Sequence, residues 1–315
     1  MTGDIKVLSG RANMPLAQEI AQRLGINLSG VDIIDFPNEN IFVRLHRSVR
    51  GQDVFIVQPT YPQVNRSIME LLIMVDALKR ASASQVTAVV PYYTYGRTDK
   101  KDQPRVPITA RLVADMIMTA GAHRLVTIDL HAGQIQGFFN IPVDELTAFH
   151  ILSDYLETKD LANAVISTAD LGFAKKARNF AERLDLPLTF VEKRRAGKKG
   201  STTESLTVIG DVMDKDCIIV EDEVSTGGTI AGTARILKEH GARSVRVAFT
   251  HAILAGDASA RLGAAEIAEF ITTNTVHIAP EKMLPNMTVL SVAPLLAEVI
   301  RRIHEGISVG EMFGE

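Results

Sequence analysis

The sequence predicts an α/β protein made of two similar domains, each with a mainly parallel sheet flanked by helices. Short apolar runs rich in β-branched residues alternate with stretches of helical periodicity, which is the pattern of parallel strands joined by helical crossovers. The alternation occurs twice along 315 residues, a length that accommodates two domains of ordinary size. Hydrophobic residues make up 46% of the chain, enough to build a core in each domain.

The first half contains four predicted strands and three predicted helices. The helix at 108–119 illustrates the reasoning, because Pro107 precedes one apolar stripe that includes Leu112 and Met116, and Gly121 follows as a stop. Residues 96–107 are rich in charge, Gly and Pro without apolar periodicity, and are predicted to form a mobile loop. In chain order the elements are strand 5–8, helix 14–24, strand 53–57, helix 65–81, strand 86–90, helix 108–119 and strand 125–130.

The second half repeats the alternation, and residues 195–203 form its predicted mobile loop. A boundary near 142–149 separates an N-terminal domain, residues 1–147, from a C-terminal domain, residues 148–315. Whether the last helix packs on its own domain or folds back onto the first is left open. The predicted elements are strand 165–167, helix 173–184, strands 188–191, 206–209 and 217–220, helix 229–240, strand 245–249 and helix 295–304.

Composition excludes several classes of protein. With 34 basic and 37 acidic residues the net charge is −3, so no general attraction to nucleic acid or to an anionic membrane is expected, and a small-molecule partner fits better. The single cysteine, Cys217, excludes an intrachain disulfide, and its apolar neighbours predict a buried thiol. The N-terminus lacks a secretory signal, and no apolar run reaches the roughly 20 residues of a membrane span, which predicts a cytoplasmic protein.

Residues 218–229, Ile-Ile-Val-Glu-Asp-Glu-Val-Ser-Thr-Gly-Gly-Thr, predict a phosphate-binding turn between a strand and a helix. Backbone N–H groups and hydroxyls at the start of a helix bind anions, helped by the helix dipole. Glu221 and Asp222, at the end of the strand, are placed to accept hydrogen bonds from two vicinal sugar hydroxyls. The simpler alternative is a turn with an ordinary helix cap. The residues of the predicted phosphate cradle are Ser225, Thr226, Gly227, Gly228 and Thr229.

This segment resembles the motif shared by type I phosphoribosyltransferases and phosphoribosyl pyrophosphate synthetases. The stretches 91–101 and 128–139 are similar to synthetase signatures that a transferase would not need, and 69–82 is similar to the synthetases too. The resemblance covers nearly the whole chain and implies two phosphoribosyltransferase-like domains, the first on the ATP side and the second binding ribose 5-phosphate. It further implies a ribose-phosphate diphosphokinase, which transfers the β,γ-diphosphoryl group of ATP to the 1-hydroxyl of ribose 5-phosphate for nucleotide biosynthesis.

The resemblance also implies the roles of individual residues. Lys193 and Arg195 match the catalytic pair, and Arg195 contacts ribose 5-phosphate as well; two cations there would stabilise the charge of an in-line transition state. Without the resemblance, their basic segment 193–200 reads equally as a nucleic-acid patch or a solvated face. His131 and Asp170 match residues that contact the Mg²⁺–ATP complex. Their alternatives are a locally hydrogen-bonded histidine and a helix cap.

The implied ATP site uses a hairpin from a neighbouring subunit, with Phe36 stacked on adenine. This sharing implies a homo-oligomer, a hexamer built from dimers. Arg97 would clamp triphosphate oxygens. The other implied ATP-binding residues are Asn38, Asn40 and Thr98.

Four residues depart from the family pattern: Thr98 replaces a glutamine, Asn40 a glutamate, and Glu221 and Ser225 each an aspartate. Because of these departures, a second hypothesis stays open: the chain is a non-catalytic regulatory relative of the synthetase. The third hypothesis is a type I phosphoribosyltransferase.

Overall fold

The computed structural model describes residues 3–169, 171–196 and 203–313. Two compact units make up the chain. Unit 1 contains Met1–Thr147, Thr275–His277 and Ser291–Glu315, and unit 2 contains Ala148–Asn274 and Ile278–Leu290. The C-terminal helix is therefore part of unit 1. The placement of ATP in the first domain and of ribose 5-phosphate in the second stays a prediction.

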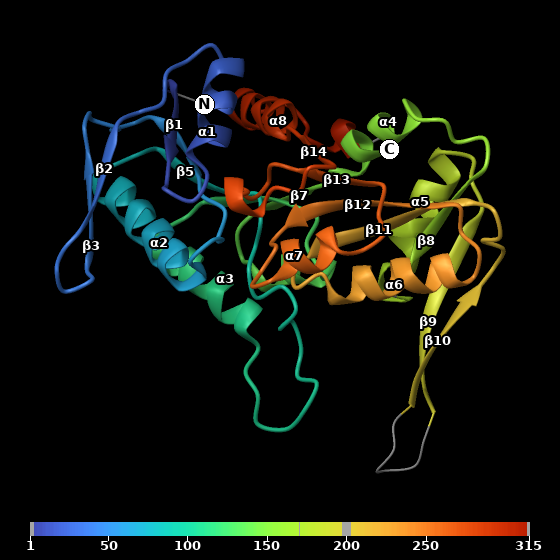
Figure 1. Ribbon diagram of the computed structural model, residues 1–315. Coiled ribbons are helices and arrows are strands. Elements are labelled where there is room, and N and C mark those ends of the chain that lie inside the picture. The colour runs from blue at the N-terminus through green and yellow to red at the C-terminus, as the bar shows by residue number, and fades with distance from the viewer. Residues whose placement is uncertain (1–2, 170, 197–202, 314–315) are drawn as a thin grey trace. The chain divides into compact units, whose positions relative to one another are not determined.

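Unit 1 is built on a five-stranded parallel sheet in the order β1-β4-β5-β6-β7 (Figure 1). Every neighbouring pair is parallel, as the alternation of strands and helices predicted. The strands are β1 (Ile5–Ser9), β4 (Asp53–Val57), β5 (Gln85–Val90), β6 (Arg124–Ile128) and β7 (Val143–Leu146). The helices are α1 (Met14–Arg23), α2 (Val64–Arg80), α3 (Thr109–Ala120) and α8 (Ala293–Glu305), with 3-10 turns η1 (Gly133–Phe138) and η4 (Gly310–Phe313).

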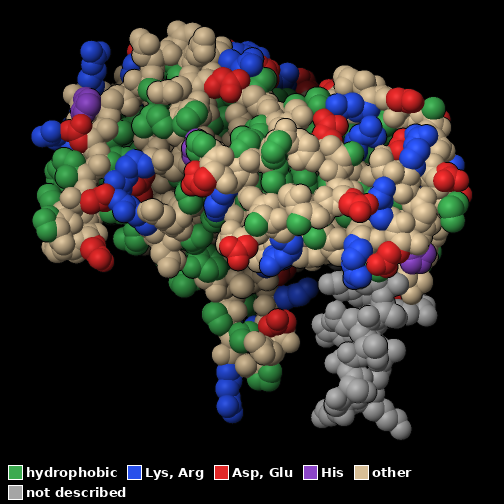
Figure 2. All heavy atoms as spheres, viewed as in Figure 1, with side chains coloured by type: hydrophobic (Ala, Val, Ile, Leu, Met, Phe, Trp, Pro, Cys, Tyr) green, Lys and Arg blue, Asp and Glu red, His purple; other side chains and the backbone are tan. Residues whose placement is uncertain are grey.

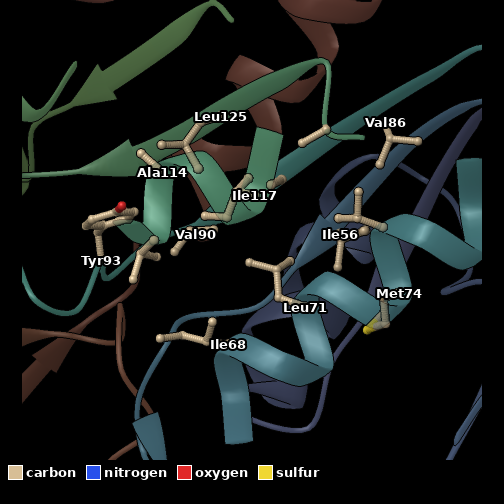
Figure 3. Close-up of a cluster of buried hydrophobic side chains, with 14 of the residues drawn as sticks. Ile56, Ile68, Leu71, Met74, Val86, Val90, Tyr93, Ala114, Ile117 and Leu125 are labelled. Atoms are coloured by element: carbon tan, nitrogen blue, oxygen red, sulfur yellow. The ribbon is translucent and has the colours of Figure 1, made fainter. Parts of the chain in front are cut away.

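The core of unit 1 lies between this sheet and helices α2 and α3. Figure 3 shows side chains of both helices meeting those of β4, β5 and β6. Alternate residues of a strand point to opposite faces, so Ile56 enters this core whereas Phe55 and Val57 are buried on the other face. Helix α1 packs against α8. Burial on both faces explains why these strands read as continuous apolar runs.

A separate hairpin of β2 (Val31–Asp35) and β3 (Ile41–Leu45) packs against α2. Its strands alternate between residues that contact the core and residues that are exposed. The residues on the inner side are Val31, Ile33, Val43 and Leu45.

Unit 2 has a seven-stranded sheet in the order β10-β9-β8-β11-β12-β13-β14, in which β10 alone is antiparallel to its neighbour. The strands are β8 (Ala164–Thr168), β9 (Leu188–Ala196), β10 (Thr203–Ile209), β11 (Asp216–Val224), β12 (Ser244–Ala252), β13 (Glu269–Thr273) and β14 (Met287–Leu290). The helices are α4 (Phe149–Glu157), α5 (Ala174–Arg183), α6 (Gly228–Glu239) and α7 (Ala258–Gly263), with 3-10 turns η2 (Leu171–Phe173) and η3 (Pro280–Lys282).

The central strand of unit 2, β11, is buried, and Cys217 within it is fully inaccessible. The predicted buried thiol is confirmed, and burial raises the pKa of Cys217 to about 11. A thiol with this pKa stays protonated near neutral pH and is therefore a poor nucleophile.

The loop predicted at 195–203 is wrong at its two ends. Arg195 and Ala196 belong to β9, and Thr203 begins β10; these strands form an antiparallel arm that extends beyond the rest of the sheet (Figure 1). The sequence of this arm, Lys-Arg-Arg-Ala at 193–196 and Thr-Glu-Ser at 203–205, has no apolar alternation, so the periodicity that identifies buried strands is missing. Residues 197–202 lie outside the described part of the chain. Residues 96–107 contain no helix or strand, as predicted.

Charge on the surface agrees with the composition. Figure 2 shows basic and acidic side chains interspersed on the visible face. In the described residues, no helix combines the length and the apolar character needed to cross a membrane.

Candidate active site

In unit 2, the turn between β11 and α6 presents its carbonyl groups to one neighbouring segment. We call Val224–Gly228 the phosphate loop and Ile253–Leu262, which follows β12, the support segment. Each of three successive carbonyls in the loop accepts hydrogen bonds from the support segment. The pairs are Ile253 N–H and Leu254 N–H to the Val224 carbonyl at 3.1 Å each, Ala255 N–H to the Ser225 carbonyl at 3.0 Å, and Arg261 Nη1 to the Thr226 carbonyl.

The opposite side of the phosphate loop carries N–H groups. In a planar trans peptide the N–H points away from the carbonyl of the preceding residue, so the N–H groups of Ser225, Thr226 and Gly227 face away from the support segment. None of the three has an acceptor among the described residues. Successive N–H groups at the start of a helix form a concave anion site. The turn therefore presents three N–H groups on the side opposite the support segment, and the binding of a phosphate there stays a prediction.

Gly227 is the residue that closes this turn. It precedes α6 with φ +70°, and a Cβ atom there would lie 2.9 Å from Cγ of Leu262. No side chain caps α6, so the alternative of an ordinary Ser/Thr helix cap is excluded. Thr226, Gly228 and Thr229 are exposed and Ser225 is half-buried, which leaves the loop accessible to a ligand.

The acidic residues lie just before the loop. Strand β11 extends to Val224, four residues beyond the predicted end, so Glu221 and Asp222 lie within the strand and not after it. Asp222 is buried, and its Oδ1 accepts a hydrogen bond of 2.7 Å from the Glu223 N–H. Glu221 is half-buried. In the sequence both acids directly precede the phosphate loop, and their contact with a sugar stays a prediction.

The proposed catalytic pair lies in the arm of unit 2. Lys193 is opposite Leu206, and Arg195 is opposite Glu204, in the β9–β10 register. The two residues thus occupy alternate positions of one strand. Asp170 lies outside the described residues.

In unit 1 the tip of the β2–β3 hairpin is a closed turn. The Phe36 N–H donates to the Asn40 carbonyl at 2.9 Å, and the Asn40 N–H donates to Oδ1 of Asn38 at 3.3 Å. The Phe36 ring is 45% exposed, and its centroid lies 5.8 Å from that of Phe42. An exposed ring fixed by a neighbouring ring is suited to stacking on a planar ligand.

Charged groups fix this hairpin beside its tip. Asp35, directly before Phe36, accepts hydrogen bonds from both terminal nitrogens of Arg11, at 2.7 and 3.0 Å, and also from Arg66. The buried Glu70 accepts the Arg11 Nε–H at 2.7 Å. The hydrogen bond to Arg11 lowers the pKa of Asp35, and the one to Asp35 raises the pKa of Arg11. Sequence reasoning missed this network, because Arg11 and Glu70 are 59 residues apart.

Two loops at the carboxyl ends of β5 and β6 meet in unit 1. Gly96 is buried, and a Cβ atom there would lie 3.3 Å from Cβ of His131. Arg97 and His131 are exposed in these adjoining loops. The Thr98 hydroxyl donates to the Tyr95 carbonyl at 2.7 Å. Gln134, three residues after His131, donates to Asp99, which joins the loops further.

The described residues contain no group of three or more His, Cys, Asp or Glu side chains arranged to hold a metal ion. Mg²⁺ is commonly bound by one or two protein groups together with substrate phosphates and water. His131 is exposed beside the Arg97 loop, and its contact with a Mg²⁺–ATP complex stays a prediction.

Comparisons with known proteins point to the same family in both halves of the chain. Residues 5–121 match the N-terminal domain of ribose phosphate pyrophosphokinase, and residues 193–314 match the phosphoribosyl synthetase-associated domain. A ribose-phosphate pyrophosphokinase of Caldanaerobacter subterraneus is 47% identical over 99% of this chain and 98% of its own, and one of Campylobacter jejuni is 46% identical over 98% of each. A crystal structure of phosphoribosylpyrophosphate synthetase from Mycobacterium smegmatis superposes with a TM-score of 0.92 at 43% identity, covering 96% of this chain and 99% of that one.

Proposed function

This chain belongs to the ribose-phosphate pyrophosphokinase family of transferases, and from that premise we propose that it converts ATP and ribose 5-phosphate into AMP and phosphoribosyl pyrophosphate. The observation that carries the proposal is the phosphate loop, with its N–H groups directed away from the support segment at the start of α6. The 5-phosphate binds at residues 225–229, and the ribose hydroxyls bind Glu221 and Asp222. The reaction supplies nucleotide biosynthesis in the cytoplasm.

The nucleotide occupies the side formed by unit 1. Adenine stacks on the exposed Phe36 of a neighbouring subunit, where the side chains of Asn38 and Asn40 complete its pocket. Arg97 and Thr98 contact the triphosphate. Because Thr98 already donates its proton to Tyr95, its hydroxyl offers only an acceptor, and Arg97 supplies the charge. The enzyme is a homo-oligomer, a hexamer built from dimers, since each adenine pocket needs two chains.

Lys193 and Arg195 supply the transition-state stabilisation. In-line transfer spreads negative charge over the oxygens around the β-phosphorus, and two cations in one strand lower that energy by electrostatics. Mg²⁺ is the proposed cofactor; it would neutralise phosphate charge and orient the triphosphate. His131 and Asp170 would hold the Mg²⁺–ATP complex. No strong general base for the ribose hydroxyl is required by this arrangement.

Phosphorus NMR of the purified chain with Mg²⁺, ATP and ribose 5-phosphate tests the proposal. We expect AMP and phosphoribosyl pyrophosphate in equal amounts. ADP in place of AMP would mean transfer of a single phosphoryl group and would contradict the mechanism. No turnover, with other triphosphates and added phosphate also tried, would favour the regulatory relative that Thr98, Asn40, Glu221 and Ser225 suggest.

A further inference from the structure

The phosphate loop depends on one side chain for its conformation. We propose that Arg261 is a positioning residue for the 5-phosphate of ribose 5-phosphate, acting through the Thr226 carbonyl. The inference rests on the proposed function of the loop. Arg261 lies in α7, which packs against α6, and its Nη1 donates to that carbonyl.

The three carbonyls of the loop are fixed by different kinds of donor. Those of Val224 and Ser225 accept only from backbone N–H groups of the support segment, whereas that of Thr226 accepts from a side chain. A substitution can therefore remove the last contact without removing the first two. A guanidinium donor makes this hydrogen bond stronger than one between neutral groups.

Among the three peptides whose carbonyls accept hydrogen bonds from the support segment, the one between Thr226 and Gly227 is the most able to reorient, because it alone adjoins a glycine. Glycine tolerates positive and negative φ, so Gly227 leaves rotation of this peptide inexpensive, and Thr226 is exposed to water. A rotated peptide would turn the Gly227 N–H away from the phosphate and direct a carbonyl oxygen toward it. Arg261 prevents this by holding the carbonyl on the side of the support segment.

Packing beneath the loop acts in the same direction. Leu262, next to Arg261, lies close under Gly227, where an added Cβ would reach to 2.9 Å of its Cγ. Residues 261 and 262 together fix the carbonyl and the α-carbon on either side of one peptide. Arg261 itself, the residues 264–266 that follow α7, and one side of α6 line a groove of about 610 Å³. Arg235 of α6 lines the same groove and pairs with Glu239 at 3.2 Å, with no contact to the loop.

The experiment compares Arg261→Ala and Arg261→Met with Arg235→Ala in the full-length protein. Affinity for ribose 5-phosphate is measured by calorimetry, and KM and kcat by steady-state kinetics in which each substrate is varied. For both Arg261 variants we expect the Kd and the KM for ribose 5-phosphate to rise about tenfold, the usual effect of losing one charge-assisted hydrogen bond. The KM for ATP, kcat and the melting temperature stay close to wild type. Arg235→Ala and the conservative Arg261→Lys remain near wild type in all of them.

Two results would overturn the inference. If an active Arg261→Met enzyme binds ribose 5-phosphate with unchanged affinity, Arg261 does not position the phosphate. If Arg235→Ala weakens the binding of ribose 5-phosphate as much as the Arg261 variants do, the effect comes from disturbing the groove and not from losing the hydrogen bond to Thr226. If Arg261→Ala does not fold, the longer Arg261→Met side chain, which keeps the packing, decides. A wild-type protein that neither binds nor turns over ribose 5-phosphate refutes the proposed function itself, whereas an active wild type with indifferent variants refutes only the role of Arg261.

Discussion

At position 227 an L-amino acid would meet two separate costs. The left-handed backbone at φ +70° is unfavourable for a side chain by about 1–2 kcal/mol, and its Cβ would approach Leu262 at 2.9 Å. We expect Gly227→Ala to lower the free energy of unfolding by at least this amount and to weaken binding of ribose 5-phosphate. Chemical denaturation followed by circular dichroism, with calorimetry of the ligand, measures both.

Gly228→Ala is the matched control, because the nearest atom to its added Cβ is Oγ1 of Thr226 at 3.8 Å. Its effect on stability should stay within about 0.5 kcal/mol, as for a surface substitution. Equal losses in the two variants would show that neither the backbone conformation nor Leu262 makes position 227 special.

Lys193→Ala and Arg195→Ala should each lower kcat by about 10²–10³-fold, the range for removing one electrostatic stabiliser of a transition state. The affinity for the nucleotide and the melting temperature should stay close to the wild-type values. Arg194, between them in β9, is the control with the same charge. A melting temperature that falls as steeply as the rate, or an Arg194→Ala enzyme that is equally slow, would show that these cations support the arm and not the reaction.

Candidate site residues that are neighbours in the sequence could be proposed from the sequence. Residues that contact a group far away in the sequence could not. The acids and glycines of 221–228 form a continuous pattern, so they could be proposed as site residues from the sequence. Arg261 reaches a carbonyl 35 residues away, and Arg11 reaches a carboxylate 59 residues away. No local signal marks such pairs, because topology alone brings them together.

Among the elements, most of the apolar runs that form buried strands were recognised, whereas several short or polar strands were missed. Strand β14 has four residues, all half-buried, and β7 has four residues that include Asp144 and Glu145. These lengths are below the window in which alternation can be counted. The first strand of the hairpin, Val31–Asp35, is likewise only half-buried or exposed. Burial alone did not make a strand predictable, because β13 is buried at four of its five residues and was missed as well.

The start of β11 carries a charge cluster whose effect depends on pH. Asp216 accepts hydrogen bonds from Arg243 Nε at 2.9 Å and from the Ser244 hydroxyl at 2.6 Å, and chiefly the bond to Arg243 lowers its pKa to about 2. A carboxylate with a lowered pKa stabilises the fold above its ordinary pKa near 4, and this contribution is lost as the pH falls from about 4 to about 2.

Asp216→Asn should therefore destabilise the protein at neutral pH, with a difference from wild type that narrows between pH 4 and pH 2. Urea unfolding at several pH values measures this difference. Asp211→Asn is the control, because Asp211 is exposed and its carboxylate contacts only the nearby Met213 N–H. A difference that is constant with pH would mean that the ion pair with Arg243 does not contribute.

For the whole molecule, the C-terminal helix is a structural part of unit 1. Ile300 of α8 is fully buried, Ser291 donates to Glu19 of α1 at 2.7 Å, and Nδ1 of His304 lies 2.9 Å from Oδ2 of Asp53. We expect Ile300→Ala to lower the unfolding free energy of unit 1 by about 2–5 kcal/mol, the cost of a buried cavity. Tyrosine fluorescence reports it selectively, because four of the five tyrosines, at 61, 92, 93 and 95, lie in unit 1.

Ile307→Ala, just beyond the helix and 42% exposed, is the control and should change stability by less than about 1 kcal/mol. If Ile300→Ala left the tyrosine transition unmoved, α8 would not be part of the cooperative unit that contains the first sheet.

The discontinuity of unit 1 sets an order for folding on the ribosome. When Thr147 has been synthesised, the chain already contains all five strands of the first sheet. Ala293, the first residue of α8, is still 146 residues further along the chain. At ordinary elongation rates of about 5–20 residues per second, the nascent chain waits roughly 10–30 s for that helix. Unit 2, whose segments end at Leu290, is complete earlier than unit 1. During that interval the apolar face of α1 lacks its partner, so the N-terminal half is the part of the nascent chain that chaperones would be expected to engage.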